Sequence, residues 1–187
     1  MHSNQARQPA FRTFAAPGRA LLALALILFG AVPAAAATYY VSPGGSDSNT
    51  GTQAAPWRTL SKANATLVAG DACMIAAGTY NDPIQPATNG TATARISYVG
   101  NLASPAAVTV GSLYIDKAYV SVKGVRSSGT IELFYTSQAA KAWHDSVAYC
   151  ISSSGLSFLG AKNCLVARST LNGTVAFLMD HAYQRVG

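Results

Sequence analysis

The side chains suited to acid–base or metal chemistry are thinly spread along this 187-residue chain. No two of its seven acidic residues lie within ten residues of each other: Asp47, Asp71, Asp82, Asp116, Glu132, Asp145 and Asp180. Because Ca²⁺ takes several oxygen ligands at once, no local stretch supplies such a site. Only a fold that stacks distant segments could assemble one, and Asp145 with Asp180 are then the candidate metal ligands. Lys141 and Arg185 lie nearby and are the candidate catalytic bases, although solvated loop charges are the favoured interpretation.

Two histidines adjoin these acids, in His144-Asp145 and Asp180-His181. Neighbouring residues of a strand point to opposite faces, so neither pair forms a joint site by itself. The run Asp-Ser-Asn-Thr-Gly at 47–51 resembles part of a Ca²⁺ loop, but it lacks the bidentate acid that completes one, which favours an Asx-turn. Three aromatic residues could stack on sugar rings or simply pack: Tyr135, Trp143 and Tyr183.

The first 37 residues carry the pattern of an export signal. Arginines and no acidic residue precede a ten-residue apolar run at 20–29, and small residues follow up to Ala37. That order predicts a secretory signal peptide cleaved after Ala36 or Ala37. The run is shorter than the roughly 20 residues that span a bilayer, which makes a membrane anchor the weaker alternative. The absence of paired arginines favours the Sec route, so we expect a secreted or periplasmic protein without membrane contact after cleavage.

Composition narrows the class of protein. The formal charge of +6 comes from 13 basic and 7 acidic residues, and the signal peptide holds three of the basic ones. No cluster of five or more basic residues occurs, so nucleic acid is not an expected partner. The three cysteines allow one disulfide at most, and Cys150–Cys164 is the only pair close in sequence. The favoured interpretation is that all three cysteines, Cys73 included, are buried apolar residues on strands.

The mature chain divides into two regions that differ in composition and in the secondary structure they predict. Residues 38–101 are rich in turn formers, with short strands expected at 38–41, 72–76 and 95–99. A helix is expected from Pro56 onward, because apolar residues recur at helical spacing on one side of it. That apolar stripe consists of Trp57, Leu60, Ala63 and Leu67.

Residues 102–187 read as a series of short apolar strands. Most are three to five residues long, at 108–110, 113–115, 119–122, 131–134, 147–151, 156–159, 164–166, 175–178 and 183–186. The run 156–159 overlays 175–178 at an offset of 19, and 119–125 overlays 163–169. A weak repeat near 20 residues indicates a solenoid. An antiparallel β-sandwich remains the alternative, since short strands and Gly-rich turns fit it as well.

A series of motifs in the first region then identifies a family resemblance. The segments Tyr-Tyr-Val-Ser-Pro-Gly-Gly-Ser-Asp-Ser-Asn-Thr-Gly at 39–51, Ala-Pro-Trp-Arg-Thr-Leu at 55–60 and Ala-Gly-Thr-Tyr at 77–80 occur in order, and Arg-Ile-Ser-Tyr-Val-Gly follows at 95–100. The chain resembles the N-terminal part of secreted right-handed parallel β-helix proteins of the pectin-lyase-like superfamily. Its relatives include pectate-lyase-like and alginate-modifying enzymes. The resemblance implies an all-β solenoid with an N-terminal capping helix, and it covers about 60 residues outside the usual site of chemistry.

The resemblance further implies lyase-like β-elimination on acidic polysaccharide, of the pectate or alginate class. In that chemistry Ca²⁺ neutralises the substrate carboxylate while a Lys or Arg removes the adjacent proton. We expect a signal peptide at 1–37, a cap and first coil at 38–101, and β-helix coils at 102–187. Only three to four coils follow the cap and no C-terminal cap is visible, so we expect an incomplete chain whose catalytic groups lie beyond Gly187. A non-catalytic glycan-binding or surface β-helix protein, or an inactive fragment, is the alternative.

Overall fold

The computed structural model describes residues 35–134, 144–159, 164–178 and 185–186. The contacts divide the chain into residues 1–34 and residues 35–187. The predicted signal peptide thus lies almost wholly outside the described residues and stays a prediction. Within the part that the structure describes, no helix is long and apolar enough to cross a membrane.

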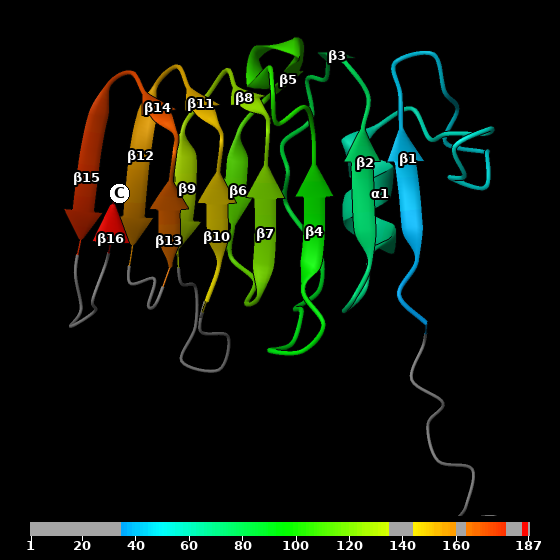
Figure 1. The fold of residues 1–187 in the computed structure, drawn as a ribbon, viewed down its shortest axis with the longest axis horizontal. Helices are drawn as coiled ribbons and strands as arrows, with labels where there is room; N and C mark the ends of the chain where they lie inside the picture. The colour runs from blue at the N-terminus through cyan, green and yellow to red at the C-terminus, as the bar shows by residue number, and fades with distance from the viewer. Residues whose placement is uncertain (1–34, 135–143, 160–163, 179–184, 187) are drawn as a thin grey trace, which may run out of the picture. The chain divides into compact units, whose positions relative to one another are not determined.

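Three parallel sheets wind around one apolar core (Figure 1). Sheet A contains β1 (Thr38–Val41), β2 (Ala72–Ile75), β4 (Ile96–Val99), β7 (Val120–Lys123), β10 (Ser146–Ala148), β13 (Leu165–Ala167) and β16 (Arg185–Val186). Sheet B contains β3 (Gly78–Thr79), β5 (Val108–Val110), β8 (Arg126–Ser127), β11 (Ile151–Ser152) and β14 (Thr170–Leu171). Sheet C contains β6 (Leu113–Ile115), β9 (Ile131–Phe134), β12 (Gly155–Leu159) and β15 (Thr174–Leu178).

Successive coils return each sheet position to the same place, one strand further along. Every ladder among the described residues is parallel, as in β10, which pairs with β7 on one side and β13 on the other. A parallel pair needs a crossover, here supplied by the other two sheets of each coil. The fold is a right-handed parallel β-helix, and the antiparallel sandwich is excluded.

The predicted repeat is confirmed by the register. Leu156 pairs with Val175 and Phe158 with Phe177, the predicted offset of 19. Val122 pairs with Val147, which pairs with Val166, so the second predicted overlay spans two coils. Inward-facing residues at equivalent positions of successive coils therefore stack on one another, and their apolar side chains form one continuous core.

The predicted strand at 108–110 is β5 of sheet B, but the sequence patterns did not resolve the other strands of this sheet. Its strands are two or three residues long, too short for any alternation to stand out. The predicted strand at 147–151 is in fact β10 and β11 with a sharp corner between them. Ser127 and Ser152 face inward from this sheet, and each hydroxyl hydrogen-bonds a nearby backbone carbonyl (Gly129, 2.9 Å; Gly155, 2.6 Å).

The predicted capping helix is present but shorter than expected. Helix α1 spans Leu60–Thr66, and the Thr59 hydroxyl caps it by accepting from the Lys62 N–H. The segment after Pro56 is extended instead, because the Trp57 N–H donates to the Tyr40 carbonyl and the Trp57 carbonyl accepts from Ser42. These bonds cover the free edge of β1, which would otherwise expose unpaired backbone groups. All four residues of the predicted apolar stripe are buried: Trp57, Leu60, Ala63 and Leu67.

Candidate functional site

Of the four predicted site residues, the structure describes one side chain. Lys141 and Asp180 lie outside the described residues, so their predicted roles stay predictions. Arg185 has a described backbone in β16, where it pairs with Leu165 of β13. Asp145 is fully described and immediately precedes β10.

Asp145 occupies an inward position at the start of a sheet A strand. Its side chain is 1% exposed, and its Oδ1 accepts a 2.7 Å hydrogen bond from the Val120 N–H of the preceding coil. On the following coil, the Cys164 thiol lies 3.9 Å from its Oδ2. Burial raises the pKa of Asp145 to about 7, although the Val120 N–H and the Arg95 charge work in the opposite direction. The structure thus gives this carboxyl a place in the core between two coils.

The described surroundings of Asp145 do not fit a Ca²⁺ site. Hard cations require several oxygen ligands, whereas the neighbours here are a backbone N–H and a thiol. In the described ranges no group of three His, Cys, Asp or Glu residues is placed to hold a metal ion. The pairing of Asp145 with Asp180 involves a residue that is not described, and it therefore remains untested.

The 47–51 loop anchors the cap. Both Asp47 carboxylate oxygens accept hydrogen bonds from the start of the helix, from the Arg58 N–H (2.9 Å), the Thr59 N–H (3.0 Å) and the Thr59 hydroxyl (2.7 Å). Partial burial raises the pKa of Asp47, but these bonds and the Lys62 charge outweigh it, so that the pKa lies below its usual value. These contacts agree with a loop-holding role for Asp47.

All three cysteines are buried and none is in a disulfide, which confirms the favoured interpretation. Cys73 lies within β2, Cys150 directly precedes β11 of sheet B, and Cys164 directly precedes β13 of sheet A. Burial raises the pKa of the Cys73 thiol to about 12. The thiols are therefore protonated at neutral pH and behave as small apolar side chains.

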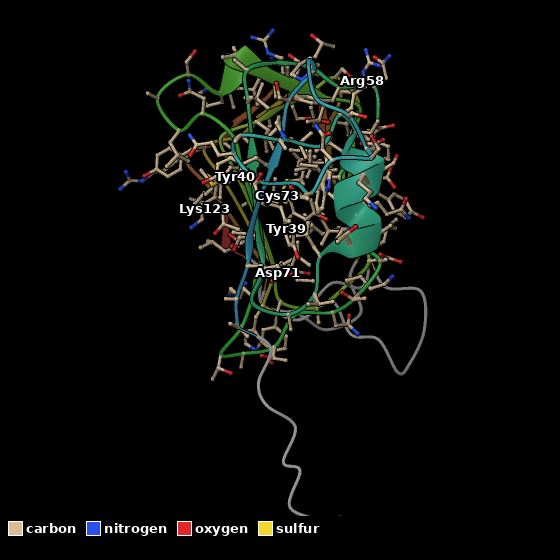
Figure 2. All side chains as sticks on the ribbon, turned by 90° about the vertical axis from the view of Figure 1, so that its right-hand side faces the viewer. Tyr39, Tyr40, Arg58, Asp71, Cys73 and Lys123 are labelled. Carbon is tan, nitrogen blue, oxygen red and sulfur yellow. The ribbon has the colours of Figure 1, made fainter. Side chains whose placement is uncertain are left out.

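The outer face of sheet A carries the most continuous array of exposed functional groups that we find in the described residues. The strand register sets one outward row along it, Tyr40–Met74–Val99–Lys123–Ala148–Ala167. Figure 2 shows Tyr40 and Lys123 on the side of the sheet away from α1. A second outward row includes Ser121 and Ser146, whose hydroxyls hydrogen-bond each other at 3.0 Å.

One rim of this face is a stack of a cation and two rings. Arg95 and Tyr119 directly precede the sheet A strands β4 and β7, and His144 lies two residues before β10 on the next coil. The Arg95 guanidinium lies 5.9 Å from the centre of the Tyr119 ring. The Tyr119 and His144 rings stack with centroids 5.4 Å apart and an interplanar angle of 18°.

The opposite rim lies at the corner where sheet A turns into sheet B. Lys123, Tyr149 and Arg168 come from three successive coils, and each lies at or just after the end of a sheet A strand. Arg168 Nη1 donates to the Tyr149 hydroxyl at 3.0 Å, and its guanidinium lies 5.6 Å from the ring centre. Lys123 and Arg168 are exposed. The sequence patterns missed both rims, because the period changes from 25 residues between Ser121 and Ser146 to 19 between Ser146 and Leu165.

A shallow pocket adjoins the N-terminal end of the same face. It has a volume of about 300 Å³ and lies between β1, β2 and the loop at 53–56. Tyr40, Met74 and Pro56 supply apolar surface, and Ser42 with Gln53 supply polar groups. No charged side chain lines it, so it is suited to an uncharged group the size of a sugar ring.

Comparisons with known proteins found the following similarities. Residues 43–118 match a family model described as a protein of unknown function (DUF1565). A stretch of 52 residues is 46% identical to the uncharacterized protein YwoF of Bacillus subtilis (strain 168), covering 28% of this chain and 11% of that protein. A solved rhamnogalacturonan lyase is similar with a TM-score of 0.42 and 18% identity, over 76% of this chain and 63% of that one. This chain spans less than two thirds of the length of both relatives. We assign the parallel β-helix from the sheet topology of the chain itself, and activity is a separate question.

Proposed function

We propose that this chain is an exported protein that engages acidic polysaccharide, with the outer face of sheet A as its contact surface. The observation that carries the proposal is the pair of rims, each of which combines cations with aromatic rings on successive coils. Cations attract uronate carboxylates, and aromatic rings present flat surfaces to the apolar faces of sugars.

The geometry favours a polymer over a small molecule. Equivalent positions on neighbouring coils are spaced by the strand separation, roughly 4.8 Å. Tyr40 and Lys123 are three strand steps apart in one row, or about 14 Å. A ligand that touches both must extend along the stack, across the strands. An extended polysaccharide does so without bending.

Lyase-like β-elimination is the catalytic form of this proposal. It requires a base and a group that neutralises the substrate carboxylate. The resemblance of the cap motifs to those of polysaccharide-degrading β-helix enzymes supports it. Lys141 and Arg185 remain the proposed bases and Asp180 a proposed ligand of the Ca²⁺ that the resemblance implies. Because the described surroundings of Asp145 do not fit Ca²⁺, we derive no step through the ion at that residue.

Two measurements on the full chain separate binding from catalysis. Retention on immobilised polygalacturonate and alginate, compared with neutral dextran, tests binding, and we expect retention on the acidic polymers only. Loss of retention with rising salt is expected, because the contacts are exposed. Ultraviolet absorbance of the unsaturated uronate product, with and without EDTA, tests elimination. Equal retention on dextran, or none on any polymer, contradicts the binding proposal.

A further inference from the structure

The corner between sheets A and B repeats one backbone conformation on three coils. Gly124, Tyr149 and Arg168 directly follow the sheet A strands β7, β10 and β13 and have φ values of 68°, 54° and 50°. This left-handed region is natural for glycine and strained for other residues. Tyr149 and Arg168 thus hold a position where glycine would be the unstrained choice.

Backbone bonds between coils fix this conformation independently of the side chains. The Gly124 N–H donates to the Ala148 carbonyl, and the Tyr149 N–H donates to the Ala167 carbonyl. A side chain at Gly124 is excluded, because its Cβ would lie 2.7 Å from the Asn101 backbone. Tyr149 and Arg168 have room for large side chains, and that of Arg168 is exposed.

The backbone of the corner requires a left-handed φ, but it does not require a non-glycine residue there. A strained side chain kept at such a position suggests a function for that side chain. Among the described residues, the non-glycine residues with left-handed φ are Tyr119, His144, Tyr149 and Arg168. All four belong to the two rims of the outer face of sheet A. The strained positions and the candidate contact surface therefore coincide.

We propose that Lys123, Tyr149 and Arg168 form a subsite that binds uronate residues of an acidic polysaccharide. This inference rests on the proposed function and assigns it to one corner. Tyr149 contacts Arg168 of the following coil. Lys123, one coil before, pairs with Ala148, the residue that precedes Tyr149.

The two cations suit carboxylates in different ways. One N–H of the Arg168 guanidinium donates to the Tyr149 hydroxyl. Its other N–H groups can bind a planar carboxylate in bidentate fashion. That bond also orients the guanidinium toward the ring. Lys123 offers a flexible ammonium two strands away, about 10 Å along the stack. Between them the outward row holds only Ala148 and Ala167, so no acidic side chain of that row competes for the cations.

The test compares polygalacturonate with its fully methyl-esterified form, in which the carboxylates are uncharged. Titration calorimetry on the full chain uses Lys123→Gln, Arg168→Gln and Tyr149→Gly, with Arg58→Gln as the charge-matched control. Arg58 is exposed and lies on the cap side, away from Lys123 (Figure 2). We expect about a tenfold loss of affinity for polygalacturonate with each glutamine variant of the corner, the scale of one charge-assisted hydrogen bond. Arg58→Gln should change it less than twofold.

Tyr149→Gly separates a loss of binding from a loss of stability. It relieves strain, so the variant should unfold at the same or a higher urea concentration while it binds polygalacturonate more weakly. Unchanged affinity in all three corner variants, with the wild-type chain binding normally, overturns the corner subsite and leaves the proposed function standing. Absence of wild-type binding overturns the proposed function itself. Equal affinity of the wild-type chain for the methyl-esterified polymer shows that carboxylates are not recognised, and also overturns the subsite.

Discussion

The capped end of the chain (residues 35–100) and the later coils (described residues from 101 on) use similar polar side chains differently. At the capped end, Asp47, Asn64, Asp71 and Asp82 direct their oxygens at backbone N–H groups. In the later coils, cationic and aromatic side chains face outward along sheet A. Irregular segments leave backbone donors without partners, and nearby side chains must satisfy them. Parallel coils pair their own backbones, so their outward side chains remain available for a ligand.

Substitution of Asn64 should break the capped end most severely. This buried amide donates to the Pro83 carbonyl (2.9 Å), and its oxygen accepts from the Gln85 N–H (3.2 Å) and the Tyr98 hydroxyl (2.9 Å). Asn64→Ala removes the partner of the buried Tyr98 hydroxyl and of two partly buried backbone groups, and should lower the free energy of unfolding by about 4 kcal/mol. Urea unfolding measures this, with the exposed helix position Ser61→Ala as control. Equal costs for the two variants would show that the amide network is not what holds the cap.

Asp145 should make the stability of the later coils depend on pH. Its folded pKa, about 7, lies above the ordinary value of 3.8, so between these values the folded state binds more protons than the unfolded one. The contribution of Asp145 to stability is therefore largest at acidic pH and falls as the pH rises toward 7, by on the order of 3–4 kcal/mol.

The matched variant is Asp145→Asn, whose amide oxygen can still accept from the Val120 N–H. It should flatten the decline in urea midpoint between pH 4 and 7. A wild-type chain whose stability rises with pH over this range would contradict the buried placement of the carboxyl.

Gly124 belongs to the later coils and packs against Asn101, directly after the capped end. A methyl group there would press on the Asn101 backbone at 2.7 Å, and its left-handed φ adds strain, so Gly124→Ala should cost about 2 kcal/mol. Tyr149→Gly, at the same place one coil later, should cost nothing or stabilise by about 1 kcal/mol. The urea midpoint of Gly124→Ala should thus fall, while that of Tyr149→Gly should stay the same or rise. Equal shifts would mean that the two corners respond alike to a change between glycine and another residue.

A smaller effect is expected at the helix start. Asp47→Ala removes three hydrogen bonds on an exposed loop and should cost about 1 kcal/mol, as for other helix caps. Because the pKa of Asp47 is lowered, its contribution is present above the unfolded pKa and is lost as the pH falls through the folded one. This direction is opposite to that of Asp145. A cost for Asp47→Ala that is unchanged in acid would argue against the charged contact.

The last prediction concerns processing rather than stability. The Ala37 N–H donates to the buried Asp71 carboxylate at 2.9 Å. Cleavage after Ala36 would place a new α-ammonium group on this carboxylate, whereas cleavage after Ala37 would remove the contact. If the predicted signal peptide is removed, we expect Ala37 as the first residue of the processed chain, determined by mass spectrometry of its N-terminal peptide. A chain that begins at Thr38 would contradict this.

The sequence by itself determined the sheets whose strands are long enough to show a pattern. Apolar runs and the 19-residue offset located β12, β15 and most of sheet A, and the stripe on α1 predicted its buried face. These signals are local, since side-chain alternation and helical spacing extend over a few residues.

Only the tertiary structure decided what depends on register between coils. Asp145 stands in the core because the residue before Ser146 lies level with Val120 and Cys164. Tyr149 meets Arg168 because coils of unequal length still bring their corners into line. The spacing of residues along the chain does not predict which corners come into line. It follows from backbone hydrogen bonding between strands, which fixes neighbours that are 19 to 25 residues apart in the chain.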